Sequence, residues 1–105
     1  MEFVETELFT TRIQKILSDE EYNLLQLILT QRPDAGNLIA GTKGLRKLRW
    51  SIPGKGKRGG ARIIYYPYLT KARIYMAYIY KKSEQEDLTS DQLKILIEYV
   101  KKGVL

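Results

Sequence analysis

The residues best suited to chemistry lie in the middle of the chain, where basic side chains gather. Residues 43–82 carry twelve Lys and Arg and no Asp or Glu, whereas residues 1–42 have a net charge of −4 and residues 83–105 a net charge of −2. Because a stretch with a net charge of +12 cannot neutralise itself locally, it either pairs with the acidic flanks or meets a polyanion. Six tyrosines share this stretch, and since tyrosine rings stack on bases, nucleic acid is the favoured polyanion. Most of these tyrosines also suit the interior or the surface of a sheet.

A glycine-rich loop in this stretch concentrates three of the cations. Residues 53–60 read PGKGKRGG, which lacks the GxxxxGK[ST] pattern of a P-loop and lies between two predicted strands. The composition predicts a cationic arm that follows a phosphate backbone through Lys55, Lys57 and Arg58. The alternative is a long hairpin loop whose lysines serve solubility alone.

Arg62 is the most specific candidate, because it interrupts an apolar strand. A guanidinium within residues 61–66 must leave the core or find a partner. Alternation along residues 45–50 places Lys47 and Arg49 on one strand face. If Arg62 shares that face, three cations form a patch that can hold a scissile phosphate and stabilise its extra charge in the transition state. The alternative is a structural arginine paired with a helix carboxylate.

Two further lysines, Lys81 and Lys82, end the last predicted strand just before the acidic run 84–87. That run resembles a metal-dependent nuclease site, but metal carboxylates usually come from separated elements, so we expect no metal. The acids instead favour the N-terminus of a following helix through its dipole. Glu84 is a candidate general base or a partner for Lys82.

Two residue types are absent, and their absence excludes several classes of site. Without cysteine the chain has no disulfide, thiolate metal site or cysteine nucleophile, and without histidine it lacks the usual general base. No apolar run is long enough to span a membrane, and the acidic N-terminus lacks the basic start of a signal peptide. We therefore expect a cytoplasmic protein with no membrane segment.

The elements that must position these residues follow from hydrophobic periodicity and capping signals. We expect a single domain over residues 1–105 with the order βααβββα, an α+β fold with a small, mainly antiparallel sheet. Ser18 and Glu21 form a capping-box pattern inside an N-terminal helical hairpin, and Thr89 and Gln92 form another before a C-terminal helix. The predicted strands are residues 2–5, 45–50, 61–66 and 73–80, with Pro67 closing the third, and the first two helices are residues 8–17 and 18–32.

Several segments resemble the HigB-like branch of the RelE/ParE toxin superfamily. They are GLRKLRW at residues 44–50, GKGKRGGARIIYY at 54–66, IYKKSE at 79–84 with DLT at 87–89, and the N-terminal residues 3–6 and 17–22. The resemblance covers nearly the whole chain and implies a RelE-like fold.

The resemblance also implies a toxin of a type II toxin–antitoxin system. Such a toxin is a metal-independent endoribonuclease that enters the ribosomal A site, cleaves mRNA there by attack of a 2′-OH on the adjacent phosphate, and so inhibits translation. The implied partners are the ribosome, mRNA and a cognate antitoxin with a DNA-binding domain. Operator DNA is reached only through the antitoxin complex, and no cofactor is implied.

Positions matched to the family complete the set of candidate site residues. The catalytic candidates are Arg62, Lys82, Arg49 and Lys47, and the RNA-binding candidates are Lys55, Lys57, Arg58, Tyr80 and Lys81. The chain departs from the family pattern at Leu45, where other branches have lysine, at Ser83, where close relatives have asparagine, and in lacking a C-terminal catalytic tyrosine. Because the related gyrase-poisoning branch lacks nuclease activity, the alternative is a non-catalytic toxin that blocks a nucleic-acid machine. An RNA-binding accessory domain is a third interpretation.

Overall fold

The computed structural model describes residues 1–51 and 60–104, without the side chains of residues 103 and 104. Its elements follow the predicted order, with one additional two-residue strand, β2. They are β1 (Glu2–Glu5), α1 (Glu7–Ile16), α2 (Asp19–Gln31), β2 (Asn37–Leu38), β3 (Arg46–Trp50), β4 (Ala61–Tyr68), β5 (Arg73–Lys81) and α3 (Ser90–Val104), with a 3₁₀ turn, Leu69–Lys71, between β4 and β5. The predicted α+β fold is therefore confirmed.

Side-chain caps begin the three helices. Thr6 accepts a hydrogen bond from a backbone N–H in the first turn of α1. Ser18 and Glu21 exchange the two hydrogen bonds of a capping box at the start of α2. At α3 the Gln92 N–H donates to Thr89 Oγ1 at 3.1 Å, and the Thr89 N–H donates to Gln92 Oε1 at 3.0 Å. Each cap satisfies backbone N–H groups that a helix leaves unpaired at its start, and both predicted capping boxes are confirmed.

The five strands form one sheet in the order β1-β5-β4-β3-β2. The pairs β3–β4 and β4–β5 are antiparallel, as their short connections predict, whereas β1 runs parallel to β5. The sheet is therefore mixed, with β4 and β5 at its centre.

The predicted end of the third strand at Pro67 is wrong, because β4 continues through this proline to Tyr68. Pro67 pairs with Ile74 of β5, whereas β3 begins only at Arg46, opposite Tyr65. Pro67 thus lies where β3 no longer flanks β4. The missing N–H of Pro67 therefore removes no hydrogen bond between β3 and β4, and a proline is tolerated at such an open edge.

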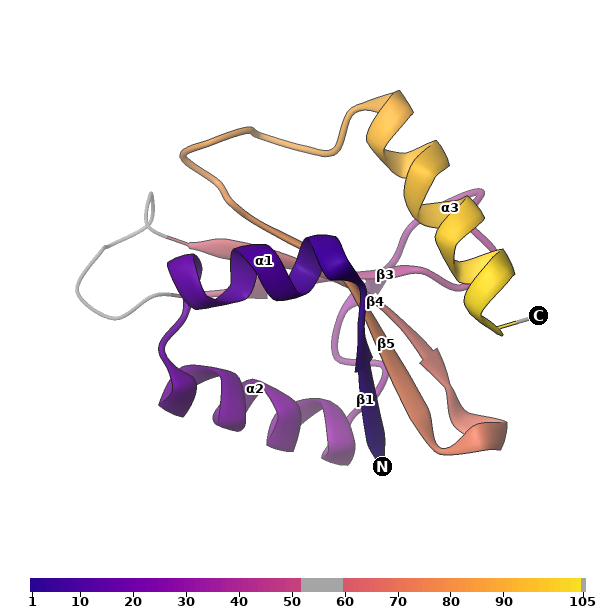
Figure 1. The fold of residues 1–105 in the computed structure, drawn as a ribbon, viewed down its shortest axis with the longest axis horizontal. Coiled ribbons are helices and arrows are strands. Elements are labelled where there is room, and N and C mark those ends of the chain that lie inside the picture. The colour runs from indigo at the N-terminus through magenta and orange to yellow at the C-terminus, as the bar shows by residue number, and fades with distance from the viewer. Residues whose placement is uncertain (52–59, 105) are drawn as a thin grey trace.

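Helices cover the two faces of the sheet, with the α1–α2 hairpin on one and α3 on the other (Figure 1). Phe9 of α1 and Ile63 of β4 belong to the core on the hairpin side. Leu96 of α3 packs with Ile64 and Tyr78 on the opposite side, as the predicted apolar stripe of this helix requires. Residues that alternate along β4 and β5 therefore serve two separate cores.

Candidate nucleic-acid interface

The strand register brings three of the predicted cations to the α3 side of the sheet. Arg49 of β3 lies directly opposite Arg62 of β4, and Lys47 lies opposite Ile64. Directly opposite residues share a face, and Ile64 belongs to the core beneath α3. We call the surface formed by Lys47, Arg49 and Arg62 the cationic face.

Arg62 is half-buried and makes no ion pair with any described carboxylate. Its Nη1 donates to the Ala61 carbonyl at 3.1 Å, which leaves most of its donors without an acceptor among the described residues. The position of a Cβ added to Gly60 would lie 3.2 Å from Arg62 Nη1, so the guanidinium lies over the glycine. The structural ion pair considered as the alternative for Arg62 is thus absent from the described part of the chain.

Arg49, on the neighbouring strand, also lacks a carboxylate partner among the described residues. Its side chain is exposed and has neither an ion pair nor a hydrogen bond within residues 1–51 and 60–104. Opposite residues in an antiparallel pair have Cβ atoms about 4.5–5.5 Å apart, and like charges there destabilise a sheet. Arg49 and Arg62 therefore form a like-charged pair with no carboxylate partner among the described residues, and an anion bound between them would relieve their repulsion.

Lys82 continues the ladder beside Arg62. Its backbone N–H donates to the Gly60 carbonyl at 2.9 Å, two positions beyond the pair formed by Arg62 and Tyr80. Lys82 and the Arg62 guanidinium therefore flank the same glycine, and the Lys82 side chain is exposed. The three cations predicted in the glycine-rich loop, Lys55, Lys57 and Arg58, lie outside the described residues.

Tyr80 lies opposite Arg62 on the other flanking strand, but its ring is fully buried. A ring with no exposed surface cannot stack on a base, so the stacking role considered for Tyr80 is not available in this structure. Its hydroxyl is also buried and makes no well-formed hydrogen bond among the described residues, although it interacts with the Asp87 carboxylate. Burial and the Asp87 carboxylate raise the pKa of Tyr80 to about 12, and Arg62 opposes this shift.

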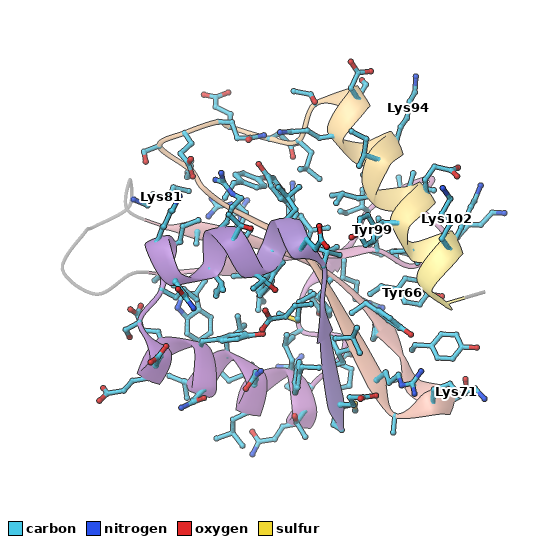
Figure 2. All side chains as sticks on the ribbon, in the orientation of Figure 1. Tyr66, Lys71, Lys81, Lys94, Tyr99 and Lys102 are labelled. Atoms are coloured by element: carbon cyan, nitrogen blue, oxygen red, sulfur yellow. The ribbon has the colours of Figure 1, made fainter. Side chains whose placement is uncertain are left out.

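Lys81 and Glu84 belong to the opposite side of the sheet, which the sequence did not predict. Lys81 pairs with Ala61, a residue of the hairpin-side core, and lies beside α1, well apart from Lys94 and Lys102 of α3 (Figure 2). Lys81 and Glu84 line a groove of about 360 Å³ against α1, together with Thr11, Arg12 and Lys15. This groove is separate from the cationic face.

Glu84 makes structural contacts in this groove. It accepts a hydrogen bond from the Lys81 N–H at 2.8 Å and forms an ion pair with Arg12 at 2.7 Å. These two contacts lower the pKa of Glu84, which makes its carboxylate a weaker base. These contacts do not include Lys82, so the predicted pairing of Glu84 with Lys82 is not present among the described residues. A carboxylate with a lowered pKa is also poorly suited to the predicted role of general base.

Asp87 is the site residue that sequence reasoning missed. Its Oδ1 lies 3.2 Å from Lys47 Nζ, on the cationic face, and it also accepts the Leu88 N–H at 2.8 Å. The Leu88 N–H and the Lys47 ammonium lower the pKa of Asp87. The sequence shows Asp87 as one member of an acidic run, and no local spacing relates it to a lysine on β3.

The acidic run is divided by these contacts, since Glu84 faces α1 and Asp87 faces Lys47. Within the described residues, no three acidic side chains lie close enough to form a metal-binding group. None of the helices in the described part of the chain has the length and hydropathy of a bilayer-spanning segment.

Comparison with known proteins places the fold. No family model matches the sequence. The structure is similar to that of the E. coli toxin RelE, solved in the free state as a mutant with two arginine-to-alanine substitutions. The similarity has a TM-score of 0.65 at 14% sequence identity, and it covers 94% of this chain and 96% of that chain. The chain therefore has a RelE-like fold.

Proposed function

We propose that the chain is a type II toxin of the HigB-like branch of the RelE/ParE superfamily, and that it cleaves mRNA in the ribosomal A site. The fold that it shares with the RelE toxin supports the toxin assignment. One observation carries the nuclease assignment: Arg62 lies opposite Arg49, and neither has a carboxylate partner among the described residues.

The proposed reaction is attack of the ribose 2′-oxygen on the adjacent phosphorus. A 2′-O–P bond forms as the P–O5′ bond breaks, so the phosphate passes through a state with additional negative charge. Arg62 and Arg49 neutralise this charge, and Lys82 and Lys47 hold the flanking phosphates. A guanidinium suits the task because its planar donors bind two phosphate oxygens at once.

Base catalysis is weak in this proposal. The chain has no histidine, and the pKa values of Glu84 and Asp87 are both lowered. A missing general base costs roughly 10²–10⁴-fold in rate. Orientation of the RNA on the ribosome offsets this loss, since well-placed intramolecular groups reach effective molarities of about 10⁵–10⁸ M. We expect the purified protein to cut mRNA on ribosomes and to leave naked RNA almost intact.

The proposed partner is a cognate antitoxin with a DNA-binding domain, which keeps the toxin inactive and brings it to operator DNA. The net charge of +12 within residues 43–82 supports an acidic or amphipathic antitoxin segment that folds on binding.

The decisive experiment is to induce the wild-type chain and the Arg62→Ala variant in bacteria and to map mRNA 5′ ends by primer extension. Wild-type induction should arrest growth and produce discrete new ends inside coding regions. Loss of one charge that stabilises the transition state typically costs about 10²–10³-fold in rate, so these ends should disappear in Arg62→Ala.

Arg73→Ala is the matched control. Arg73 is an exposed arginine on the same sheet, but it pairs with Glu2 beside β1, away from the cationic face. New ends should persist in this variant. Growth arrest without new ends would instead support the non-catalytic toxin, and absence of growth arrest would favour an accessory RNA-binding domain.

A further inference from the structure

Among the described residues, Asp87 is an acid that lies on the cationic face, and its position is informative. Asp87 Oδ1 lies 3.2 Å from Lys47 Nζ, although the two residues are 40 positions apart in the chain. The carboxylate therefore stands on the surface where, under the function proposed above, an RNA phosphate must bind. A carboxylate and a phosphodiester are both anionic acceptors, and they cannot occupy the same place beside one ammonium group.

The neighbouring Tyr80 hydroxyl lacks a well-formed hydrogen bond among the described residues. Tyr80 has no exposed surface, and the Asp87 carboxylate interacts with its hydroxyl. A buried polar group without a partner is costly and calls for an explanation. A phosphate oxygen that replaced the Asp87 carboxylate would give this hydroxyl an acceptor.

Asp87 is held loosely enough to move. Its side chain is 67% exposed, and it interacts with Lys47, with the N–H of the next residue, Leu88, and with the Tyr80 hydroxyl. The segment itself is anchored separately, because the Gln85 side chain donates to the Asp87 carbonyl at 2.7 Å and to Gln92 at 2.8 Å. Since exposed ion pairs contribute little to stability, the carboxylate can leave Lys47 while the segment stays in place.

We propose that Asp87 occupies the place of an RNA phosphate in the free protein, and that the phosphate displaces it to bind the Lys47 ammonium and the Tyr80 hydroxyl. This inference rests on the proposed function and adds a phosphate subsite to it. Asp87 acts as a competitor of the substrate and not as a base, so its removal strengthens binding.

The test measures binding without cleavage. A short fluorescein-labelled 2′-O-methyl RNA lacks the attacking hydroxyl, and its affinity is measured by fluorescence anisotropy at fixed low salt. Asp87→Asn should bind about fivefold more tightly than the wild type, which corresponds to the loss of one competing exposed ion pair. Tyr80→Phe should bind several-fold more weakly without any loss of thermal stability.

Glu86→Gln is the matched control, because Glu86 is exposed in the same segment and has no ion pair or hydrogen bond within the described residues. Glu86→Gln should change the RNA affinity by less than about twofold, because solvent ions screen the distant charge of Glu86. Equal effects of Asp87→Asn and Glu86→Gln, or weaker binding by Asp87→Asn, would overturn the inference.

Arg62→Ala separates this inference from the proposed function. If Arg62→Ala weakens RNA binding but Asp87→Asn behaves like the control, Asp87 does not compete with the phosphate, whereas the proposal that RNA binds on the cationic face is retained. If Arg62→Ala leaves binding unchanged, the cationic face is not the RNA site and both proposals fail.

Discussion

Two buried tyrosines should respond in opposite directions to the same substitution. Tyr65 and Tyr80 lie on neighbouring strands, and neither has exposed surface. The Tyr65 hydroxyl donates to the Pro33 carbonyl at 2.8 Å and accepts the Gly36 N–H at 2.8 Å. The Tyr80 hydroxyl has no such partner among the described residues.

The magnitudes follow from the cost of burying an unpaired polar group, about 1–3 kcal/mol. Tyr65→Phe leaves a buried N–H and a carbonyl without their partner, and should destabilise the protein by that amount. Tyr80→Phe removes a hydroxyl that makes no well-formed hydrogen bond, and should stabilise the protein by about 1 kcal/mol, the lower end of the range because the Asp87 carboxylate interacts with it. For a chain of this size the latter corresponds to a rise in Tm of about 4 °C.

Thermal and urea unfolding of the wild type and both variants would measure this difference. The two free energies of unfolding should differ by about 2 kcal/mol or more, with an unchanged urea m-value. If Tyr80→Phe were destabilised as much as Tyr65→Phe, the Tyr80 hydroxyl would have a partner in the free protein, and the reasoning from its isolation would be refuted.

Two further predictions concern packing and pH. Gly36→Ala should destabilise the protein by about 1–3 kcal/mol in urea unfolding, because a Cβ there would lie 2.9 Å from the Lys47 carbonyl and from the Tyr65 ring. An unchanged urea midpoint would show that the loop moves aside without cost. The Lys81 N–H and Arg12 lower the pKa of Glu84, so its stabilising contribution should be complete above the ordinary Glu pKa, about 4.3, and lost as the pH falls through the lowered native value. Glu84→Gln should flatten the acid side of a urea-midpoint profile, and profiles that run parallel to the wild type would contradict this.

Local features of the chain were largely predictable. Ser18 and Thr89 indicate where two helices begin, because all the residues that form a capping box lie within four consecutive positions. Alternation along a strand also placed Lys47 and Arg49 on one face without knowledge of any neighbour. The exception is Pro67, since its effect on β4 depends on where the neighbouring strand β3 begins.

The composition of the site was decided by tertiary structure. The register between β3 and β4 sets Arg49 opposite Arg62, and a shift of one residue would have sent Arg62 to the other face. Contacts between Lys47 and Asp87, and between Arg12 and Glu84, join residues 40 and 72 positions apart. Caps and alternation arise from interactions between near neighbours, which the amino-acid sequence determines by itself. Burial of the Tyr80 hydroxyl and the pairing of distant charges arise from packing of the whole chain, and only the folded structure decides them.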